Sequence, residues 1–385
     1  MAILIKRFYF TRLNELLFLN LIIAIAISIL NPIWPLYFNT FFNNNSLVGA
    51  FSSILSMVAL VSFFIFTPII EKYSERKIYL YGLLISILIL ILLAFNESFY
   101  FFVILILIYV MVSVLRAESF GIIYREESKI KTLGKNEGLL YLLSNIGWLI
   151  GALFVIILLS AYNFKIIFLF SALFTFLASL IFLLYRKNIK KKYKNINFLI
   201  NIKNFLKNKE LSKLYISSLG TSIWLGFIFI YIPLYIVENG FDKSFVGIFL
   251  FVFLIPYLIE YFVGKKSDIV GTKFFIVSGY FLMGLFTILA YFIDNIYLIL
   301  FFLVLGSFGV SFTAPTREVH FFKIIKKVEE EHYYGIFLTH MEVGLLLGKI
   351  IPAILLLFFN FKIVFLVIGV TMFLFFLYSF KLKNI

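Results

Sequence analysis

The chain has 385 residues, of which 63% are hydrophobic, 20% aromatic and 14% charged, and its mean hydropathy is +1.07. A soluble domain has roughly 45–50% apolar and about 25% charged residues, so the composition excludes a water-soluble globular protein and indicates an integral membrane protein. The chain has no cysteine, which excludes disulfides, thiolate zinc sites and cysteine nucleophiles.

Twelve stretches are apolar enough to cross a bilayer, which takes about 20 residues in a helix. In chain order we predict spans at 13–38, 47–70, 78–95, 99–121, 138–160, 164–185, 212–237, 244–263, 273–293, 296–316, 335–358 and 362–380. No small-residue cleavage site follows the charged N-terminal segment, so we expect no cleavable signal peptide. The predicted fold class is an all-α membrane protein with twelve transmembrane helices.

Positive charge is concentrated in alternate loops. The formal net charge is +15 at pH 7, which in a soluble protein would suggest nucleic acid. If the N-terminus is cytoplasmic, the outer loops hold only Lys165, Lys243 and Lys362. This is the positive-inside pattern, so we expect a multi-pass protein of the cell membrane with both termini cytoplasmic and no nucleic-acid partner. The basic stretch 186–211 can also touch anionic lipid, although topology alone explains its charge.

Four short patterns recur along the chain at a separation of 197 or 198 residues. They are NFKIIFL at 163–169 and NFKIVFL at 360–366, SLVGAF at 46–51 and SFVGIF at 244–249, PLY at 35–37 and 233–235, and glycines at 138, 147 and 151 and at 335, 344 and 348. Each copy has the same place relative to a predicted span. We therefore predict two parallel six-helix repeats, an N-terminal bundle over 1–185 and a C-terminal bundle over 212–385, joined by a basic cytoplasmic linker over 186–211.

Between predicted spans 8 and 9 the chain reads GKKSDIVGTK, from Gly264 to Lys273. Gly264 allows close packing at a helix end, and Asp268 in a tight turn can cap the positive N-terminus of a neighbouring helix. Gly271 permits a positive φ angle, and Lys273 can anchor the next span among the headgroups. This pattern, at this place in a twelve-span chain with a twofold repeat, resembles the signature of the major facilitator superfamily.

The matching loop between spans 2 and 3 reads TPIIEKYSERK at 67–77. Glu71 corresponds to Asp268 and Arg76 to Lys273, but Ser74 replaces the second glycine, so this copy departs from the family pattern. The resemblance implies a transporter that works by alternating access. It also implies that these loops act as latches on the cytoplasmic side, through Glu71, Arg76, Gly264, Asp268, Gly271 and Lys273.

In that family the first and fourth helices of each half line a central cavity, which implies spans 1, 4, 7 and 10 here. Their polar and aromatic residues are candidate substrate contacts, although packing explains each one alone: Asn20, Asn31, Trp34, Tyr37, Tyr109, Trp224, Tyr231, Ser307, Ser311 and Thr313. Pro32, Pro35 and Pro233 are expected to break or bend the outer ends of spans 1 and 7. Gly147 and Gly151 faintly resemble the family's antiporter motif, which favours export, but close helix packing explains them as well.

Ionisable residues at membrane depth are costly and usually functional. Lys349, near the middle of span 11, can attract an anionic substrate or pair with a coupling carboxylate; the alternative is a structural ion pair. Glu342 lies about 10 Å away by helical rise, too far for direct pairing. Glu342 and His340 can both titrate, but both lie near the cytoplasmic end, where the alternative is that they are solvated.

Glu260 lies in span 8, and its counterpart in the first half is Phe63. It can carry a proton, or it can form an interhelical salt bridge.

Two pairs of charged residues end spans 4 and 10, namely Arg116 with Glu118 and Arg317 with Glu318. Arginines at similar places in the family join a cytoplasmic charge network with the loop acids. The resemblance therefore implies that both pairs are gate residues rather than substrate ligands.

No P-loop, HExxH or G-x-S-x-G pattern is present. We therefore expect no enzyme, no cofactor and no metal site, and no transport driven by ATP. The first interpretation is a monomeric secondary active transporter that exports a small organic solute, drug or metabolite, with a proton as the coupling ion. The second is uptake or facilitated diffusion of a sugar, organic acid or other metabolite. The third is a membrane sensor or scaffold on a degenerate transporter fold, which the intact loop at 264–273 argues against.

Overall fold

The computed structural model describes residues 12–127, 133–161, 163–184, 198–325 and 330–385. These residues form α-helices and a 3₁₀ segment, and none of the described ranges contains a strand. Twelve helical stretches within them are long and apolar enough to cross a membrane. This confirms the predicted number of spans and the all-α fold class.

The first half contains the helices that precede the predicted linker. They are α1 (Arg12–Leu30), α2 (Ile33–Phe42), α3 (Asn45–Lys72), α4 (Glu75–Ala94), α5 (Phe99–Glu127), α6 (Leu133–Ala161) and α7 (Phe164–Leu184). α1 and α2 together make the first span.

The second half follows α8 (Phe198–Lys207), which lies within the predicted linker. Its elements are α9 (Lys209–Glu238), α10 (Ser244–Leu254), the 3₁₀ segment η2 (Ile255–Ile259), α11 (Glu260–Val270), α12 (Thr272–Tyr291), α13 (Ile296–Ile324), α14 (Glu330–Leu355) and α15 (Phe361–Ser379). α10, η2 and α11 together make the eighth span.

Helix breaks occur at two prolines. The first span is interrupted before Pro32, as predicted, because proline cannot donate the backbone hydrogen bond that would continue the helix. Pro233 lies inside the continuous helix α9, so a break at this position is excluded. The sequence predicts span 8 as 244–263 without a break. The structure instead extends this span to Val270 and interrupts it at η2, whose second residue is Pro256.

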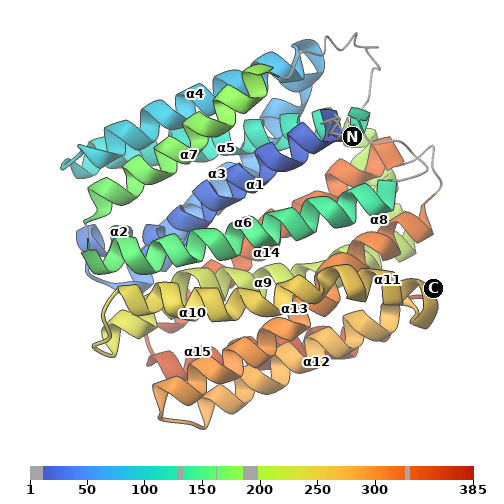
Figure 1. Cartoon of the computed structure of the whole chain (residues 1–385). Coiled ribbons are helices and arrows are strands. Elements are labelled where there is room, and N and C mark those ends of the chain that lie inside the picture. The colour runs from blue at the N-terminus through green and yellow to red at the C-terminus, as the bar shows by residue number, and fades with distance from the viewer. Residues whose placement is uncertain (1–11, 128–132, 162, 185–197, 326–329) are drawn as a thin grey trace, which may run out of the picture.

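The two halves form two bundles that lie side by side (Figure 1). α3 packs against α14 and α6 packs against α10, so the second and fifth spans of each half build the interface. α1 begins and α15 ends at the same end of the molecule, which we call the linker end (Figure 1). The opposite end, where α2 meets α3 and α14 meets α15, is called the hairpin end.

The same helix contact recurs in both halves, as the repeat predicts. A Cβ atom added to Gly147 of α6 would lie 2.7 Å from the carbonyl oxygen of Leu21 on α1. A Cβ atom added to Gly344 of α14 would lie 2.8 Å from the carbonyl oxygen of Leu219 on α9. The two backbones in each pair approach so closely that only glycine fits, which is the small-residue packing that membrane helices use. The repeat is therefore present in the packing as well as in the sequence.

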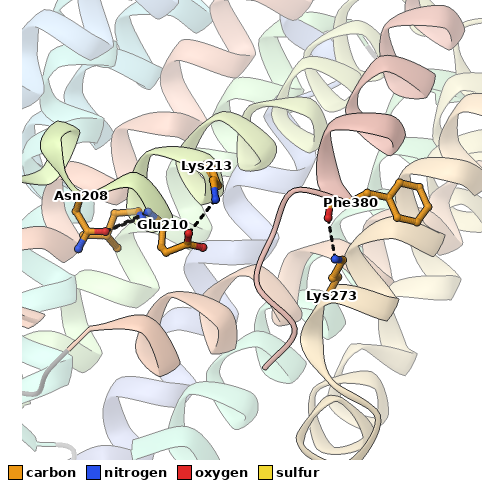
Figure 2. Close-up of polar contacts among 6 residues, drawn as sticks. Asn208, Glu210, Lys213, Lys273 and Phe380 are labelled. Atoms are coloured by element: carbon orange, nitrogen blue, oxygen red, sulfur yellow. Dashed lines mark hydrogen bonds and ion pairs between the residues drawn. The ribbon is translucent and has the colours of Figure 1, made fainter.

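α8 packs on the second half at the linker end. Phe205 is fully buried, and its ring centroid lies 5.9 Å from that of Tyr215 on α9 and 5.9 Å from that of Tyr333 on α14. Asn208 then caps α9 by accepting the backbone N–H of Glu210 at 3.1 Å, and Lys213 pairs with Glu210 at 2.8 Å (Figure 2). Part of the predicted linker is thus a helix that is anchored to one bundle.

Candidate functional site at the interface of the two halves

Polar contacts join the two halves at the hairpin end. The side-chain amide of Asn45, at the start of α3, donates to Glu238 Oε2 at the end of α9 over 2.5 Å. The hydroxyl of Ser46 donates to the carbonyl oxygen of Ala353 on α14 over 2.6 Å. The second span therefore touches the seventh and the eleventh here, beside a hollow of about 480 Å³ that Asn45, Ser46 and Glu238 help to line.

The halves also meet at the linker end. The hydroxyl of Tyr141 on α6 donates to Glu318 Oε1 on α13 over 3.2 Å. The guanidinium of Arg125 on α5 lies 3.7 Å from the ring centroid of Tyr334 on α14, in a cation–π arrangement. The structure thus has contacts between the halves at both ends.

Glu260 is a buried carboxylate at this interface. It begins α11, is 6% exposed, and accepts a hydrogen bond of 2.9 Å from the side-chain amide of Asn145 on α6. The same amide donates to the carbonyl oxygen of Tyr257 over 3.2 Å, and Ser311 donates to that of Pro256 over 2.8 Å. Side chains of both halves thus donate to backbone carbonyls at the η2 break, and the carbonyl oxygen of Tyr257 also accepts the backbone N–H of Glu260.

Arg317 lies beside this carboxylate. Its side chain on α13 is 7% exposed, and its Nε and Nη1 atoms have no hydrogen-bond partner among the described residues. It interacts electrostatically with Glu260 and with His340 on α14. His340 Nδ1 lies 2.6 Å from the carbonyl oxygen of Phe337, which can only accept, so Nδ1 donates and Nε2 of a neutral ring is the free acceptor. The buried cation therefore lies within electrostatic range of both a carboxylate and an imidazole.

Lys349 makes a second contact across the interface. Its Nζ donates to the hydroxyl of Ser56 on α3 over 2.6 Å, and its own carbonyl oxygen accepts from the hydroxyl of Tyr231 over 2.5 Å. Glu342 interacts with Lys349 electrostatically, but these two described residues form no ion pair, in agreement with the spacing along the helix. Lys349 thus carries a charge into the interface with a neutral partner.

These contacts share one arrangement. Glu260, Glu318 and Lys349 belong to the second half, and each is hydrogen-bonded to a neutral side chain of the first half, namely Asn145, Tyr141 and Ser56. A neutral partner gives up a charge at a lower cost than an ion of opposite sign. The interface can therefore separate at these points when the charge of the second-half residue changes or finds another partner.

The signature loop differs from its prediction at Gly264 and at Asp268. Gly271 has a φ angle of +94°, as predicted. Asp268 lies in the last turn of α11 rather than in a tight turn, and it pairs with Lys323 of α13 at 3.3 Å instead of capping a helix. Lys273 donates to the carbonyl oxygen of Phe380 over 2.7 Å (Figure 2). These contacts stay within the second half. Gly264 lies inside α11 rather than at its end, and an added Cβ atom there would make only an ordinary contact of 3.7 Å with Pro315.

The other latch and gate candidates are spread over the linker end. Arg76 lies over the ring of Phe182 in the first half, and the side chain of Glu71 lies outside what the structure describes. Arg116 is buried in the first half and donates to Ser86 on α4 over 3.3 Å, and Glu118 follows on the same helix, α5. Of these candidates, Glu318 is the one for which the structure describes a hydrogen bond to the opposite half. A gate role for the two arginine pairs stays a prediction.

Most of the predicted cavity residues are packed inside their own half. In the second half Trp224 donates to Thr287 over 2.9 Å, Thr313 accepts from Thr221 over 2.9 Å, and Ser307 donates to the carbonyl oxygen of Val304. These side chains and those of Tyr231 and Ser311 are buried. Four of them pack within the second half, which the sequence left open as the alternative, whereas the hydroxyl of Tyr231 lies against Gly49 of the first half. Contact with a substrate stays a prediction for all five.

In the first half the same holds for several candidates. Asn20 donates to Ser144 over 2.6 Å within the first half. Trp34 and Tyr37 enter an aromatic cluster, and the ring centroid of Trp34 lies 5.7 Å from that of Tyr109. Asn31 continues the backbone hydrogen bonding of α1. Contact with a substrate stays a prediction for these five residues.

Sequence reasoning missed the first-half members of the interface. Asn145, Tyr141 and Ser56 are uncharged, so the cost of placing a charge in the membrane does not single them out. Asn145 carried a signal nonetheless, because at a separation of 197 residues its counterpart is Glu342, one of the predicted titrating residues. A polar side chain at both copies of an otherwise apolar position marks a place in the interface.

Sequence comparison relates both halves to one family. The model of the Major Facilitator Superfamily matches residues 16–260 and 238–384. The chain belongs to this superfamily. An uncharacterized MFS-type transporter of Methanocaldococcus jannaschii is 26% identical over 148 residues, and the match spans only 38% of that relative and 38% of this chain.

Solved transporters share its fold. The nucleoside transporter NupG has a TM-score of 0.75 and 16% identity, with 97% of this chain and 100% of that chain covered. A POT family transporter, solved in complex with a thioalcohol-conjugated peptide, has a TM-score of 0.75 and 14% identity, with 95% and 94% covered. At these identities the likeness shows the twelve-helix fold and does not transfer a substrate.

Proposed function

We propose that this transporter is a secondary active exporter that couples the outward movement of a small organic solute to the inward movement of protons by alternating access. The observation that carries the coupling is the buried contact between Glu260 and Asn145 beside Arg317. It places a group that can bind a proton at a point where the two halves touch.

Protonation of Glu260 would change this contact in two ways. An ionised carboxylate is the stronger acceptor for the Asn145 amide, because a charged acceptor roughly doubles the strength of a hydrogen bond. It also balances the charge of Arg317. A protonated Glu260 does neither, so the closed contact between α6 and α11 becomes weaker. Proton binding and opening at the linker end are then linked, since a ligand shifts a conformational equilibrium through its differential affinity for the two states.

Lys349 supports a separate role in solute binding. It lies at the contact between α3 and α14, and its partner there, Ser56, is neutral. An anionic group of a solute is a stronger partner for an ammonium than a hydroxyl is. We propose that Lys349 attracts such a group and exchanges Ser56 for it.

The distribution of lysine and arginine supports an orientation with the linker end in the cytoplasm. Among the described residues, Lys165, Lys243 and Lys362 lie towards the hairpin end, whereas most of the other lysines and arginines lie towards the linker end (Figure 1). Both termini are then cytoplasmic in a cell membrane, and a single copy contains both halves of the site. The Gly147 and Gly151 pair favours export, through its likeness to the antiporter motif.

The first experiment identifies the solute. Detergent-purified protein is screened for thermal stabilisation by metabolites and lipophilic drugs at pH 5.5 and pH 7.5, with nucleosides and short peptides included. A ligand that binds only the folded state raises stability by about RT ln(1 + [L]/Kd). Proteoliposomes then report uptake of the solute that the screen identifies, with and without an imposed pH gradient.

The decisive variant is Glu260→Gln. We expect it to keep solute exchange without a gradient and to lose accumulation driven by a pH gradient, because glutamine keeps the amide contact but cannot release a proton. Glu342→Gln is the matched control in the other interface helix and is expected to keep both. Unchanged gradient-driven accumulation in Glu260→Gln would refute the coupling role of Glu260. Wild-type flux that ignores the gradient would indicate facilitated diffusion, and flux of no solute would indicate a scaffold.

A further inference from the structure

A groove opens on the outer side of the second half near the linker end, away from the interface between the halves. It lies among η2, α11, α12 and α13, and its volume is about 470 Å³. Figure 1 shows α11 beside the C-terminus at this end. The groove is lined by Ile259, Phe262, Val263, Lys265, Lys266, Ile269, Phe275 and Phe312. Its wall is therefore apolar apart from two consecutive lysines.

The apolar wall is built from side chains of different helices. The rings of Phe275 on α12 and Phe312 on α13 are perpendicular, with centroids 5.6 Å apart. Phe262 and Ile269 on α11 are 65% and 84% exposed. Large apolar side chains on the outside of a membrane protein face acyl chains, and here they border a hollow rather than a flat helix surface. The apolar wall of the hollow is complementary to a lipid acyl chain, and its volume can hold part of one.

The two lysines have no competing partner among the described residues. Lys265 and Lys266 are exposed on α11 and form no described ion pair or hydrogen bond. The acid that follows them on the same helix, Asp268, is already paired with Lys323 at 3.3 Å. The local charge is therefore positive at the height where the eighth span ends. Lysine side chains near the end of a span extend towards the headgroup region.

From these observations we infer that the groove binds an anionic phospholipid of the leaflet at the linker end, with an acyl chain against Phe262 and Phe275 and the headgroup phosphate at Lys265 and Lys266. The anionic charge selects against zwitterionic lipids, because clustered lysines attract acidic headgroups. This inference is independent of the proposed solute and coupling, since none of the lining residues takes part in either.

The repeat supports a specific role for the lysines. At the separations of 197 and 198 residues that relate the halves, the counterparts of Lys265 and Lys266 fall among Thr67, Pro68 and Ile69, which are all uncharged. The fold therefore does not require a basic pair at this place. The pair distinguishes one loop of the repeat from the other.

The test is lipid binding to the full-length protein by native mass spectrometry, with dioleoylphosphatidylglycerol and dioleoylphosphatidylcholine titrated separately. We expect the wild type to retain phosphatidylglycerol preferentially. Lys265→Gln combined with Lys266→Gln should lower the affinity for phosphatidylglycerol roughly tenfold and leave phosphatidylcholine unchanged. Lys203→Gln combined with Lys207→Gln on α8 is the matched control, because it removes the same charge from the same end outside the groove, and it should change neither affinity.

Two further measurements separate the tail from the headgroup. Phe262→Ala should weaken the binding of both lipids while keeping the ratio of their affinities. A thermal stability that matches the wild type excludes misfolding as the cause. Soluble glycerol 1-phosphate at the same concentration should not bind. The inference would be overturned if the groove variant (Lys265 and Lys266) kept its affinity for phosphatidylglycerol, or if the α8 variant (Lys203 and Lys207) lost as much affinity as the groove variant. Tight binding of glycerol phosphate alone would overturn it as well.

Discussion

The two halves of the molecule share a framework and differ in where they can ionise. Gly147 and Gly344 make the same close helix contact in the first and second half. Yet four described hydrogen bonds across the interface join an ionisable side chain of the second half to a neutral side chain of the first: Glu238 with Asn45, Glu260 with Asn145, Glu318 with Tyr141, and Lys349 with Ser56. The two halves therefore pack their helices in the same way, but in these four hydrogen bonds the ionisable side chain always belongs to the second half.

Symmetry-related contacts show how far this division goes. Gly138 of the first half faces Tyr261 of the second at 3.6 Å, and Gly335 of the second half faces Phe63 of the first at 4.0 Å, as measured to an added Cβ atom. Tyr261 and Phe63 are 198 residues apart. The counterpart of Glu260 is therefore Ser62, and the sequence-based assignment of Phe63 is wrong by one residue. Each carboxylate of the pair Glu260 and Glu342 thus corresponds to a neutral residue in the other half.

The largest expected effect tests the shared framework. Gly151→Val and Gly348→Val should each destabilise the protein by at least about 2 kcal/mol, because a side chain must enter a closely packed helix pair. An added Cβ atom would lie 2.9 Å from the carbonyl oxygen of Ile25 at Gly151 and 2.8 Å from the carbonyl carbon of Ile223 at Gly348. Thermal unfolding and folded yield in detergent measure the effect.

The control for this pair is Gly121→Val, since no atom lies within 4 Å of an added Cβ atom there. Its unfolding temperature should lie within a few degrees of that of the wild type. A large loss for one interior glycine and none for the other would show that the two halves are not equivalent in packing.

The next largest effect tests the ionisable side chains of the second half. Lys349→Met keeps the length of the side chain and removes its charge. We expect the initial rate of solute flux to fall at least about tenfold, because a charge-assisted contact with the solute is worth roughly 1.5–3 kcal/mol. The folded yield should stay intact. Ser56→Ala removes the neutral partner and should reduce the rate less. A loss of flux that follows a loss of folded protein would make Lys349 structural instead.

The smallest effect concerns the signature loop. Asp268→Asn breaks an ion pair with Lys323 whose carboxylate side chain is 66% exposed, so the stability should fall by less than about 1 kcal/mol. The pair lies within the second half, and we expect the labelling of single cysteines introduced along α5 and α13 to stay unchanged. The chain contains no native cysteine, so this labelling has no background. Increased labelling from the linker end would contradict this expectation and support the latch between the halves that the family resemblance implies.

Much of the fold could be predicted, because hydropathy and repeat spacing report on the membrane directly. The twelve spans and the break before Pro32 follow from length, apolarity and the missing N–H group of proline. The interruption at Pro256 did not follow, because a proline within an apolar stretch does not say whether the helix continues around it. In this chain the flanking carbonyls found donors on Asn145 and Ser311.

The site was harder to predict than the fold, because lipid-facing and buried sides of a membrane helix are both apolar. Glu260 and Lys349 were found through their charge, but Trp224 and Thr313 were assigned to a cavity although they bond within their own half. The spacing of apolar residues along the sequence does not distinguish a residue that faces a cavity from one that packs within its own half. The neutral partners Asn145 and Ser56 could be recognised only once the halves were placed against each other.

The side-chain amide of Asn145 satisfies two acceptors at once, Glu260 and the carbonyl oxygen of Tyr257. When the halves move apart at this point, both acceptors lose this donor together. The carbonyl oxygen of Tyr257 keeps the backbone N–H of Glu260, but the Glu260 carboxylate needs a new donor, because an unsatisfied polar group in an apolar interior costs several kcal/mol. Water must therefore enter as the contact opens, so that opening is a wetting transition as well as a rotation of one bundle. Osmotic pressure, which lowers the activity of water, then shifts the equilibrium towards the closed form.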